Sequence, residues 1–207
     1  MNFIKTDIEG LIIVEPRIFE DSRGYFFESY NETEFIKNGI HNRFIQDNQS
    51  LSCYGVIRGL HCQKGEHAQA KLVRVLHGKV LDVAVDIRIG SKTFGQHVTV
   101  ELADENKRQL FIPRGFLHGY AVLSDTAVFA YKFDNLYCKE SDAGVRYDDI
   151  SLGIDWQIPS DTTIISAQDM LLGDMPNVPG YRCYRTAWQR TYAAFNQRPF
   201  CWQSRPG

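Results

Sequence analysis

Apolar and polar residues alternate over the stretch 81–88. The odd-numbered positions from 81 to 87 are apolar, whereas Asp82, Asp86 and Arg88 lie between or just after them. A period of two is typical of a β-strand, because successive side chains point to opposite faces. The pattern therefore predicts a strand with one packed face and one face polar enough to line a cavity.

The chain from residue 44 onward is a series of short runs rich in β-branched and aromatic residues, separated by Gly, Asn or Asp. We expect strands within 44–52, 54–61, 71–88, 97–103, 109–123 and 127–133. An earlier strand is expected over 11–19, before an acidic turn at 21–24. Strands at this spacing, with hardly any helical periodicity between them, predict an all-β sandwich or jelly roll.

Helix signals are few. Asn31 followed by Glu34 forms a capping-box pattern, which predicts a short helix that stops at Gly39. Ser166 and Asp169 have the same spacing. From the residues alone, Asp169 is equally compatible with capping a second short helix and with orienting a catalytic histidine, and the two roles are compatible with each other.

Composition restricts the functional classes. The chain has 207 residues and a formal net charge of −2, which argues against nucleic acid or an anionic membrane as the main partner. No signal-peptide-like segment and no run of about 18 apolar residues is present, so we expect a cytoplasmic protein. Five cysteines without a CxxC pair predict reduced thiols rather than a disulfide framework or a thiolate zinc site.

We expect one domain, residues 1–180, followed by a tail over 181–207. The tail contains five arginines, scattered aromatic residues and no clear apolar period. A native extension, a partner-binding segment and a sequence of frame-shifted or engineered origin all stay open as its explanation.

Candidate chemistry is concentrated in the stretch 55–82. Arg58, His61, Lys71 and Asp82 stand there among short apolar runs, and we expect them to form one wall of an active site. Asp82 either supports the histidines or pairs with Arg88.

A second candidate segment begins at Pro113. The pattern Pro-x-Gly-x-x-His, ending at His118, resembles the second cupin motif, and it suggests that His61 and His118 face each other across a small barrel. His61 is followed by Cys62 and Gln63, so the His-x-His pair of metal-binding cupins is missing. This argues against a metal site.

A series of motifs in this order matches one family. The motifs cover 19–28, 46–50, 58–61, 83–88, 113–119, 131–137 and 166–169. With them the sequence, from about residue 3 to 176, resembles the dTDP-4-dehydrorhamnose 3,5-epimerases, cofactor-free cupins that act on dTDP-4-dehydro-6-deoxyglucose. The resemblance implies an all-β fold, a cupin-type jelly-roll β-barrel with a few short helices, with neither cofactor nor metal.

The resemblance also implies a role for each matching residue. His61 is the base, held by Asp169, Tyr131 is the acid on the opposite face of the sugar, and Lys71 lies at the C4 oxygen. The residues implied to bind the dTDP-sugar are Arg23, Phe26, Glu28, Gln46, Asn48, Arg58, His118, Tyr137, Asp142 and Gln168. A homodimer is implied as well, in which the N-terminal segment with Phe26 reaches the site of the other subunit.

Proton chemistry gives an independent reason for this set. Epimerisation beside a ketone removes an α-proton, stabilises an enolate and returns a proton from the other side. A histidine oriented by a carboxylate suits the first step, a buried ammonium the second, and a weakly acidic phenol the third. Arginines suit the diphosphate, because a guanidinium binds phosphate oxygens in bidentate fashion.

Two positions depart from the common family pattern. Gln168 stands where Lys is usual, and Asp142 where a longer Glu is often found. Three alternatives to the double epimerase stay open: a single-site 3- or 5-epimerase of a related sugar, a metal-dependent cupin enzyme, and a barrel that binds a sugar nucleotide without catalysis.

Overall fold

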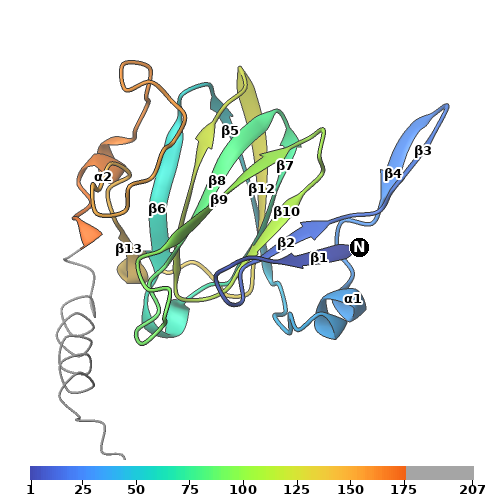
Figure 1. The fold of residues 1–207 in the computed structure, drawn as a ribbon, viewed down its shortest axis with the longest axis horizontal. Helices are drawn as coiled ribbons and strands as arrows, with labels where there is room; N and C mark the ends of the chain where they lie inside the picture. Colours follow the sequence, from blue (N-terminus) through green and yellow to red (C-terminus); the bar gives the residue numbers. More distant parts are fainter. Residues whose placement is uncertain (176–207) are drawn as a thin grey trace, which may run out of the picture.

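A computed structural model describes residues 1–175, and the predicted tail lies outside the described residues. Two antiparallel sheets dominate the fold (Figure 1). The six-stranded sheet has the order β1 (Asn2–Lys5), β2 (Ile12–Glu15), β10 (Gln109–Ile112), β7 (Lys71–His77), β12 (Thr126–Phe133) and β5 (Gln46–Cys53). The five-stranded sheet has the order β13 (Asp142–Gly144), β6 (Ile57–Gln63), β11 (Phe116–Val122), β8 (Lys79–Asp86) and β9 (His97–Ala103).

The remaining elements are short. Strands β3 (Ile18–Asp21) and β4 (Gly24–Phe27) form a separate two-stranded hairpin. The helices among the described residues are α1 (Glu32–Lys37), α2 (Ala167–Met170) and the 3₁₀ turns Gly65–His67 and Lys139–Ser141. None of these helices is long and apolar enough to cross a membrane. The prediction of an all-β fold with few short helices is therefore confirmed.

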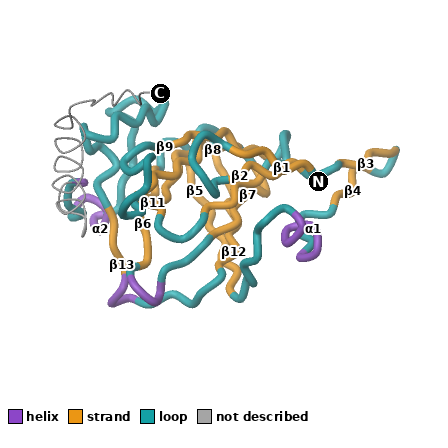
Figure 2. The backbone as a smooth tube through the Cα atoms, turned by 60° about the horizontal axis from the view of Figure 1, so that its bottom comes forward, coloured by secondary structure: helices purple, strands orange, loops and turns teal. Residues whose placement is uncertain are grey.

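The main core lies between the two sheets, where side chains such as Val73 and Phe129 of the six-stranded sheet meet Val80 and Leu102 of the five-stranded one. A second cluster covers the outer face of the five-stranded sheet, under the segment 145–175. A third lies under α1, on part of the outer face of the six-stranded sheet. Figure 2 shows the sheets between these two coverings.

Strand β8 confirms the alternation that the sequence predicts. Leu81, Val83 and Val85 pack outward into the cluster under the C-terminal segment. The even-numbered side chains point the other way, and among them Asp82 is fully buried beside a histidine. Both faces of this strand are thus buried, and the face that carries the even-numbered residues supplies the carboxylate of Asp82.

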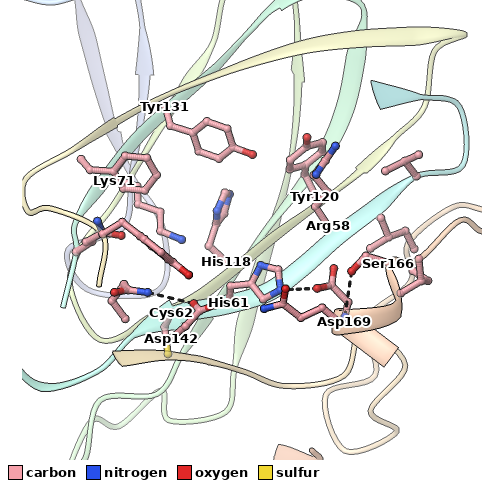
Figure 3. A pocket seen from close by; sticks show the side chains of 18 of the residues that line it. Arg58, His61, Cys62, Lys71, His118, Tyr120, Tyr131, Asp142, Ser166 and Asp169 are labelled. Carbon is pink, nitrogen blue, oxygen red and sulfur yellow. Dashed lines mark hydrogen bonds and ion pairs between the residues drawn. The ribbon is translucent and has the colours of Figure 1, made fainter. Parts of the chain in front are cut away.

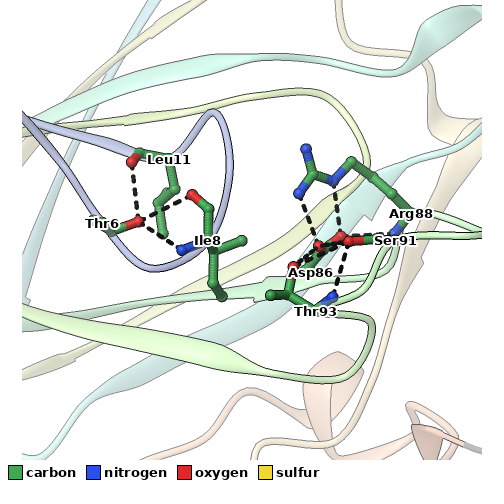
Figure 4. A network of polar contacts seen from close by, with 7 residues as sticks. All are labelled: Thr6, Ile8, Leu11, Asp86, Arg88, Ser91 and Thr93. Atoms are coloured by element: carbon green, nitrogen blue, oxygen red, sulfur yellow. Dashed lines mark hydrogen bonds and ion pairs between the residues drawn. The ribbon is translucent and has the colours of Figure 1, made fainter.

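Asp86, at the end of β8, organises the loop that follows it (Figure 4). Its carboxylate accepts hydrogen bonds from Arg88, Ser91 and Thr93 at 2.6–2.9 Å. Burial alone raises the pKa of Asp86, but these donors outweigh it and lower the pKa to about 2. Arg88 is therefore the partner of Asp86, which leaves Asp82 for the histidines. Figure 4 also shows Thr6 closing the β1–β2 turn.

Two expectations about local structure had different outcomes. The single strand predicted over 11–19 is wrong, because the chain is divided into β2 and β3 around Pro16, which has no N–H to continue a ladder. The predicted helix is confirmed: Asn31 caps α1 by accepting the Glu34 N–H at 3.2 Å.

Candidate active site

One cavity of about 650 Å³ opens between the two sheets (Figure 3). All four residues predicted to be catalytic line it. Five of the predicted substrate-binding residues line it as well. Together these nine are Arg58, His61, Lys71, His118, Tyr131, Tyr137, Asp142, Gln168 and Asp169.

His61 and Asp169 form a hydrogen-bonded pair, although they are 108 positions apart in the chain. His61 Nε2 lies 2.9 Å from Asp169 Oδ1. The backbone N–H of Asp169 donates to Ser166 Oγ at 3.0 Å, so the capping arrangement and the pair with the histidine are both present. Burial alone raises the pKa of Asp169, but His61, Ser166 and the Gly59 N–H lower it overall. The carboxylate is ionised and fixes the imidazole, which leaves Nδ1 as the ring nitrogen able to accept a proton.

Lys71 is a buried ammonium on the opposite sheet from Arg58, His61 and Asp82, so the prediction that these four residues form one wall of the site is wrong. It begins β7, and only 8% of its surface is exposed. Burial lowers the pKa of Lys71 to about 8, while the charges of Cys62, Asp82 and Asp142 act in the other direction. The ammonium is still protonated at neutral pH, in a site where a positive charge has little solvent to screen it.

His118 and Asp82 form a second histidine–carboxylate pair. His118 Nε2 lies 3.0 Å from Asp82 Oδ2, and both side chains are buried. Burial lowers the pKa of His118, with Asp82 opposing that effect, so the imidazole is neutral at neutral pH. The other oxygen of this carboxylate, Asp82 Oδ1, is buried without a hydrogen-bond partner among the described residues.

The predicted position of the two histidines relative to each other is wrong. His61 and His118 are direct neighbours in register on β6 and β11, within one sheet, and do not face each other across the barrel. The strands come very close here, since a Cβ added to Gly59 would lie 2.5 Å from Gly119 Cα. A motif locates each histidine on a strand, but it does not specify which strands are adjacent.

Tyr131 comes from the wall opposite His61. It lies on β12, where its ring stacks on Phe133 at 5.6 Å and meets Phe129 edge-on at 4.7 Å. Burial raises the pKa of Tyr131 well above its usual value. The phenol therefore keeps its proton until a strong base forms beside it.

The mouth of the cavity is bordered by the segment that connects β12 to β13. Gln63 fixes this segment through both groups of its amide: Oε1 accepts the Cys138 N–H at 2.9 Å and Nε2 donates to Asp142 Oδ1 at 3.1 Å. Tyr137 immediately precedes Cys138 and is exposed. Arg58, also exposed, donates from Nε to Ser52 Oγ at 3.1 Å.

Gln46 and Asn48 lie beside the cavity on the edge strand β5. They pair in register with Phe133 and Tyr131, whose side chains line the cavity, so they share that face of the sheet. Gln46 also accepts the Tyr137 N–H at 3.2 Å, which ties the mouth segment to β5. These two predicted residues therefore lie next to the cavity without being among the residues that line it.

Three predicted residues are not brought to this cavity within one chain. Arg23 and Phe26 belong to the β3–β4 hairpin, which extends away from the barrel, and Glu28 follows it (Figure 1). Arg23 pairs with Asp21 on the hairpin itself, at 2.5 Å. Phe26 is 71% exposed.

Some lining residues were absent from the sequence-based set. Tyr120 and Phe133 line the cavity from the two sheets, and Cys62, Gln63 and Gln69 from the region around its mouth. Tyr120 lies two positions after His118 on one strand, so the period of two places both on the same face. That spacing could have identified Tyr120.

Across residues 1–175, no group of three or more His, Cys, Asp or Glu side chains is arranged to hold a metal ion.

Comparisons with known proteins identify the family of this chain. The model of the dTDP-4-dehydrorhamnose 3,5-epimerase family matches residues 5–176. The dTDP-4-dehydrorhamnose 3,5-epimerase of Escherichia coli (strain K12) is 54% identical over 157 residues, which are 75% of this chain and 85% of that protein. The dTDP-4-dehydrorhamnose 3-epimerase of Streptomyces niveus is 36% identical over 163 residues, 78% of each chain.

A solved structure gives the same result for the fold. The crystal structure of dTDP-6-deoxy-D-glucose-3,5-epimerase from Legionella pneumophila Philadelphia 1, in complex with dTDP-4-keto-L-rhamnose, has a TM-score of 0.82 and 48% identity to this chain. The match covers 86% of this chain and 94% of that one. The predicted cupin-type jelly roll and the predicted epimerase class are confirmed, and this chain belongs to the dTDP-4-dehydrorhamnose 3,5-epimerase family.

Proposed function

We propose that this protein epimerises dTDP-4-dehydro-6-deoxy-α-D-glucose at C3 and C5, giving dTDP-4-dehydro-β-L-rhamnose. One observation carries the proposal: the His61–Asp169 pair, Lys71 and Tyr131 line a single cavity. Base, enolate-stabilising cation and acid are thus within reach of one sugar ring. The family and its relatives support the substrate.

His61 removes the α-proton. Asp169 accepts the N–H at Nε2, so Nδ1 carries the lone pair that takes the proton from carbon. The ionised carboxylate then stabilises the imidazolium that results.

Lys71 and His118 stabilise the enolate. The developing charge on the C4 oxygen meets an ammonium held in a desolvated site, where the interaction is much stronger than in water. His118 is oriented by Asp82 and adds a second polar contact from the neighbouring strand.

Tyr131 returns the proton from the other face of the ring. His61 comes from β6 of the five-stranded sheet and Tyr131 from β12 of the six-stranded sheet, so base and acid approach from opposite walls. Removal on one side and return on the other inverts the carbon.

The rest of the dTDP-sugar is bound at the mouth. Arg58, Tyr137, Asp142 and Gln168 border it, and Gln46 and Asn48 extend the polar surface along β5. We propose that the site is completed in a homodimer by Arg23, Phe26 and Glu28 of a second copy of this chain.

Two features support the dimer. The hairpin is a two-stranded sheet that pairs with neither main sheet among the described residues, and such an isolated pair is marginal in water. Its side chains Phe19, Tyr25 and Phe26 are more than half exposed. A second chain would cover these aromatic side chains and use Arg23 beside the diphosphate.

The test is incubation with dTDP-4-dehydro-6-deoxyglucose in deuterated water, with the C3 and C5 proton signals followed by NMR. We expect both signals to exchange and the L-sugar to accumulate. Exchange at one carbon only would identify a single-site epimerase, and binding without exchange would leave a non-catalytic sugar-nucleotide protein.

A chelator arm completes the experiment. Because Lys71 serves as the electrophile, prolonged chelation should leave turnover unchanged. Activity that disappears with chelator and returns with one added metal would overturn the cofactor-free mechanism in favour of a metal-dependent cupin enzyme.

A further inference from the structure

Tyr120 reaches across the barrel interior beside the proposed acid. It lies on β11 of the five-stranded sheet and is 1% exposed. Its Oη lies 3.0 Å from Ser50 Oγ on β5 of the other sheet. The contact therefore joins the two sheets inside the cavity that both tyrosines line.

The ring of Tyr120 is fixed as firmly as its hydroxyl. It stacks on Phe129 with centroids 4.3 Å apart and planes at 9°. Phe129 is two positions before Tyr131 on β12 and contacts that ring edge-on at 4.7 Å. Figure 3 shows the Tyr131 hydroxyl directed toward Tyr120.

The hydroxyls of Tyr120 and Ser50 together supply one O–H that can donate to a third group. Either Ser50 donates to Tyr120 or Tyr120 donates to Ser50, and in both cases one O–H remains unused by the pair. A donor matters most when its acceptor becomes charged, because hydrogen bonds to an ion are about twice as strong as neutral ones. Tyr131 acquires that charge when it gives its proton to the enolate carbon.

Both Tyr120 and Ser50 affect the pKa of the Tyr131 phenol. Burial is the main reason that the pKa of Tyr131 is raised, the Tyr120 phenol adds to it, and the Ser50 hydroxyl opposes it by stabilising the ionised form. The acidity of Tyr131 is thus sensitive to this pair.

We propose that Tyr120 is a positioning residue for Tyr131: its hydroxyl donates to Ser50 and holds it, so that the Ser50 hydroxyl can donate to the Tyr131 oxygen as the proton leaves. This inference rests on the proposed function, in which Tyr131 is the acid. The proton passes from the Tyr131 oxygen to the enolate carbon, and Tyr120 and Ser50 keep theirs. The pair therefore governs how often an enolate is reprotonated with inversion.

The test is Tyr120→Phe, which removes one oxygen and keeps the stack on Phe129. In deuterated water we measure two quantities: deuterium washed into recovered substrate and inverted product formed. We expect deuterium exchange to persist while inverted product per exchange event falls about tenfold, the effect of losing one hydrogen bond in the transition state. Ser50→Ala should act in the same direction, and the double variant should fall by less than the product of the two effects.

Controls separate this role from a structural one. Tyr147→Phe removes a phenol hydroxyl outside the cavity and should leave the ratio unchanged. A loss of packing would reduce exchange and inversion together, so an unchanged ratio in Tyr120→Phe overturns the inference.

A failure of the proposed mechanism would give a different result from a failure of the Tyr120 inference alone. If Tyr131→Phe itself leaves the ratio unchanged, Tyr131 is not the acid, and both proposals fall. If Tyr131→Phe abolishes inversion while Tyr120→Phe keeps the wild-type ratio, only the role of Tyr120 is wrong.

Discussion

Polar and charged side chains are buried in the barrel interior but exposed on the β3–β4 hairpin. Inside the barrel, Lys71, Asp82 and His118 are each less than one tenth exposed. Burial changes their properties there: it lowers the pKa of Lys71 to about 8 and keeps His118 neutral. On the hairpin, Arg23 is exposed and pairs with Asp21, whose side chain is about half exposed.

The difference separates two kinds of functional residue. An interior group obtains its reactivity from its own chain, because desolvation and fixed partners are already present. A hairpin group is solvated, and an exposed ion pair contributes little to stability. The role proposed for it in binding the dTDP-sugar therefore requires a second surface to cover it.

The largest expected effect lies in the interior. His61→Asn should lower activity by about a thousandfold or more and remove exchange at both carbons, and Asp169→Ala should cause a large part of that loss. The variants should remain folded by circular dichroism, and the measurement is the NMR exchange experiment.

The surface offers a matched control for this pair. His77 Nδ1 lies 3.2 Å from Asp104 Oδ2, but this histidine is two thirds exposed and lies outside the cavity. His77→Asn should keep wild-type exchange. Normal exchange in folded His61→Asn would refute the assignment of the base.

The next effect concerns Lys71. Lys71→Met should lower activity by about a hundredfold, since an oxyanion-stabilising donor is lost. Wild-type turnover should fall as pH rises through about 8, because the ammonium deprotonates there. Neither His118 nor Tyr131 accounts for that fall, because burial lowers the pKa of His118 and raises that of Tyr131.

As pH rises above about 8, the free energy of unfolding should increase while turnover falls. A folded-state pKa below the unfolded value means that charged Lys71 destabilises the fold, most strongly below pH about 8, and that the penalty is relieved as pH rises toward 10.5, the ordinary pKa of a lysine. Lys71→Met should therefore raise the melting temperature at neutral pH by a few degrees, whereas the surface variant Lys37→Met should change neither activity nor melting temperature. A less stable Lys71→Met protein would contradict the desolvation argument.

The sequence predicts features that depend on neighbouring residues better than contacts between residues far apart in the chain. Local alternation identifies β8 and the buried face that carries Asp82. The pair between His61 and Asp169 joins distant parts of the chain, and the spacing from Ser166 predicts only a helix cap. Tyr120 shares a face with His118 by its spacing, but it is missed because a tyrosine in an apolar run resembles any core aromatic.

Strand adjacency is the other limit. The motifs around His61 and His118 predict strands, but the register that makes them neighbours depends on close approach at Gly59 and Gly119. A pattern within one strand does not encode the identity of the next strand. The break at Pro16 is different, since the residue itself could have shown that no single strand runs through 11–19.

The third effect tests the hairpin. Arg23→Ala/Phe26→Ala should lower activity by roughly ten- to a hundredfold, as expected when an anchor residue is truncated at an interface. If these residues act in the partner's site, a heterodimer of this variant with His61→Asn contains one intact site of two. Isolated with two affinity tags, it should recover about half of wild-type activity.

The interior provides the control for this recovery. A heterodimer of His61→Asn with Lys71→Met has no intact site, because both residues belong to the same chain's cavity. It should stay inactive. Failure of the hairpin heterodimer to recover would show that Arg23 and Phe26 do not act across a dimer.

The smallest effect is at the cavity mouth, which combines features of both regions. Gln63 is buried on a rigid strand, yet through Cys138 and Asp142 it fixes an exposed segment. Gln63→Ala should raise KM by roughly three- to tenfold and leave kcat within about twofold, because the segment binds substrate without moving protons.

Gln63→Glu keeps the acceptor for the Cys138 N–H but sets a carboxylate against Asp142, so its KM should rise at least as much and fall again at lower pH. Asn106→Ala removes another amide side chain that fixes a backbone turn, away from the cavity, and should leave KM unchanged. If Gln63→Ala lowers kcat as strongly as it raises KM, the mouth segment takes part in the chemistry, and the boundary between binding and proton transfer lies further out than the cavity walls suggest.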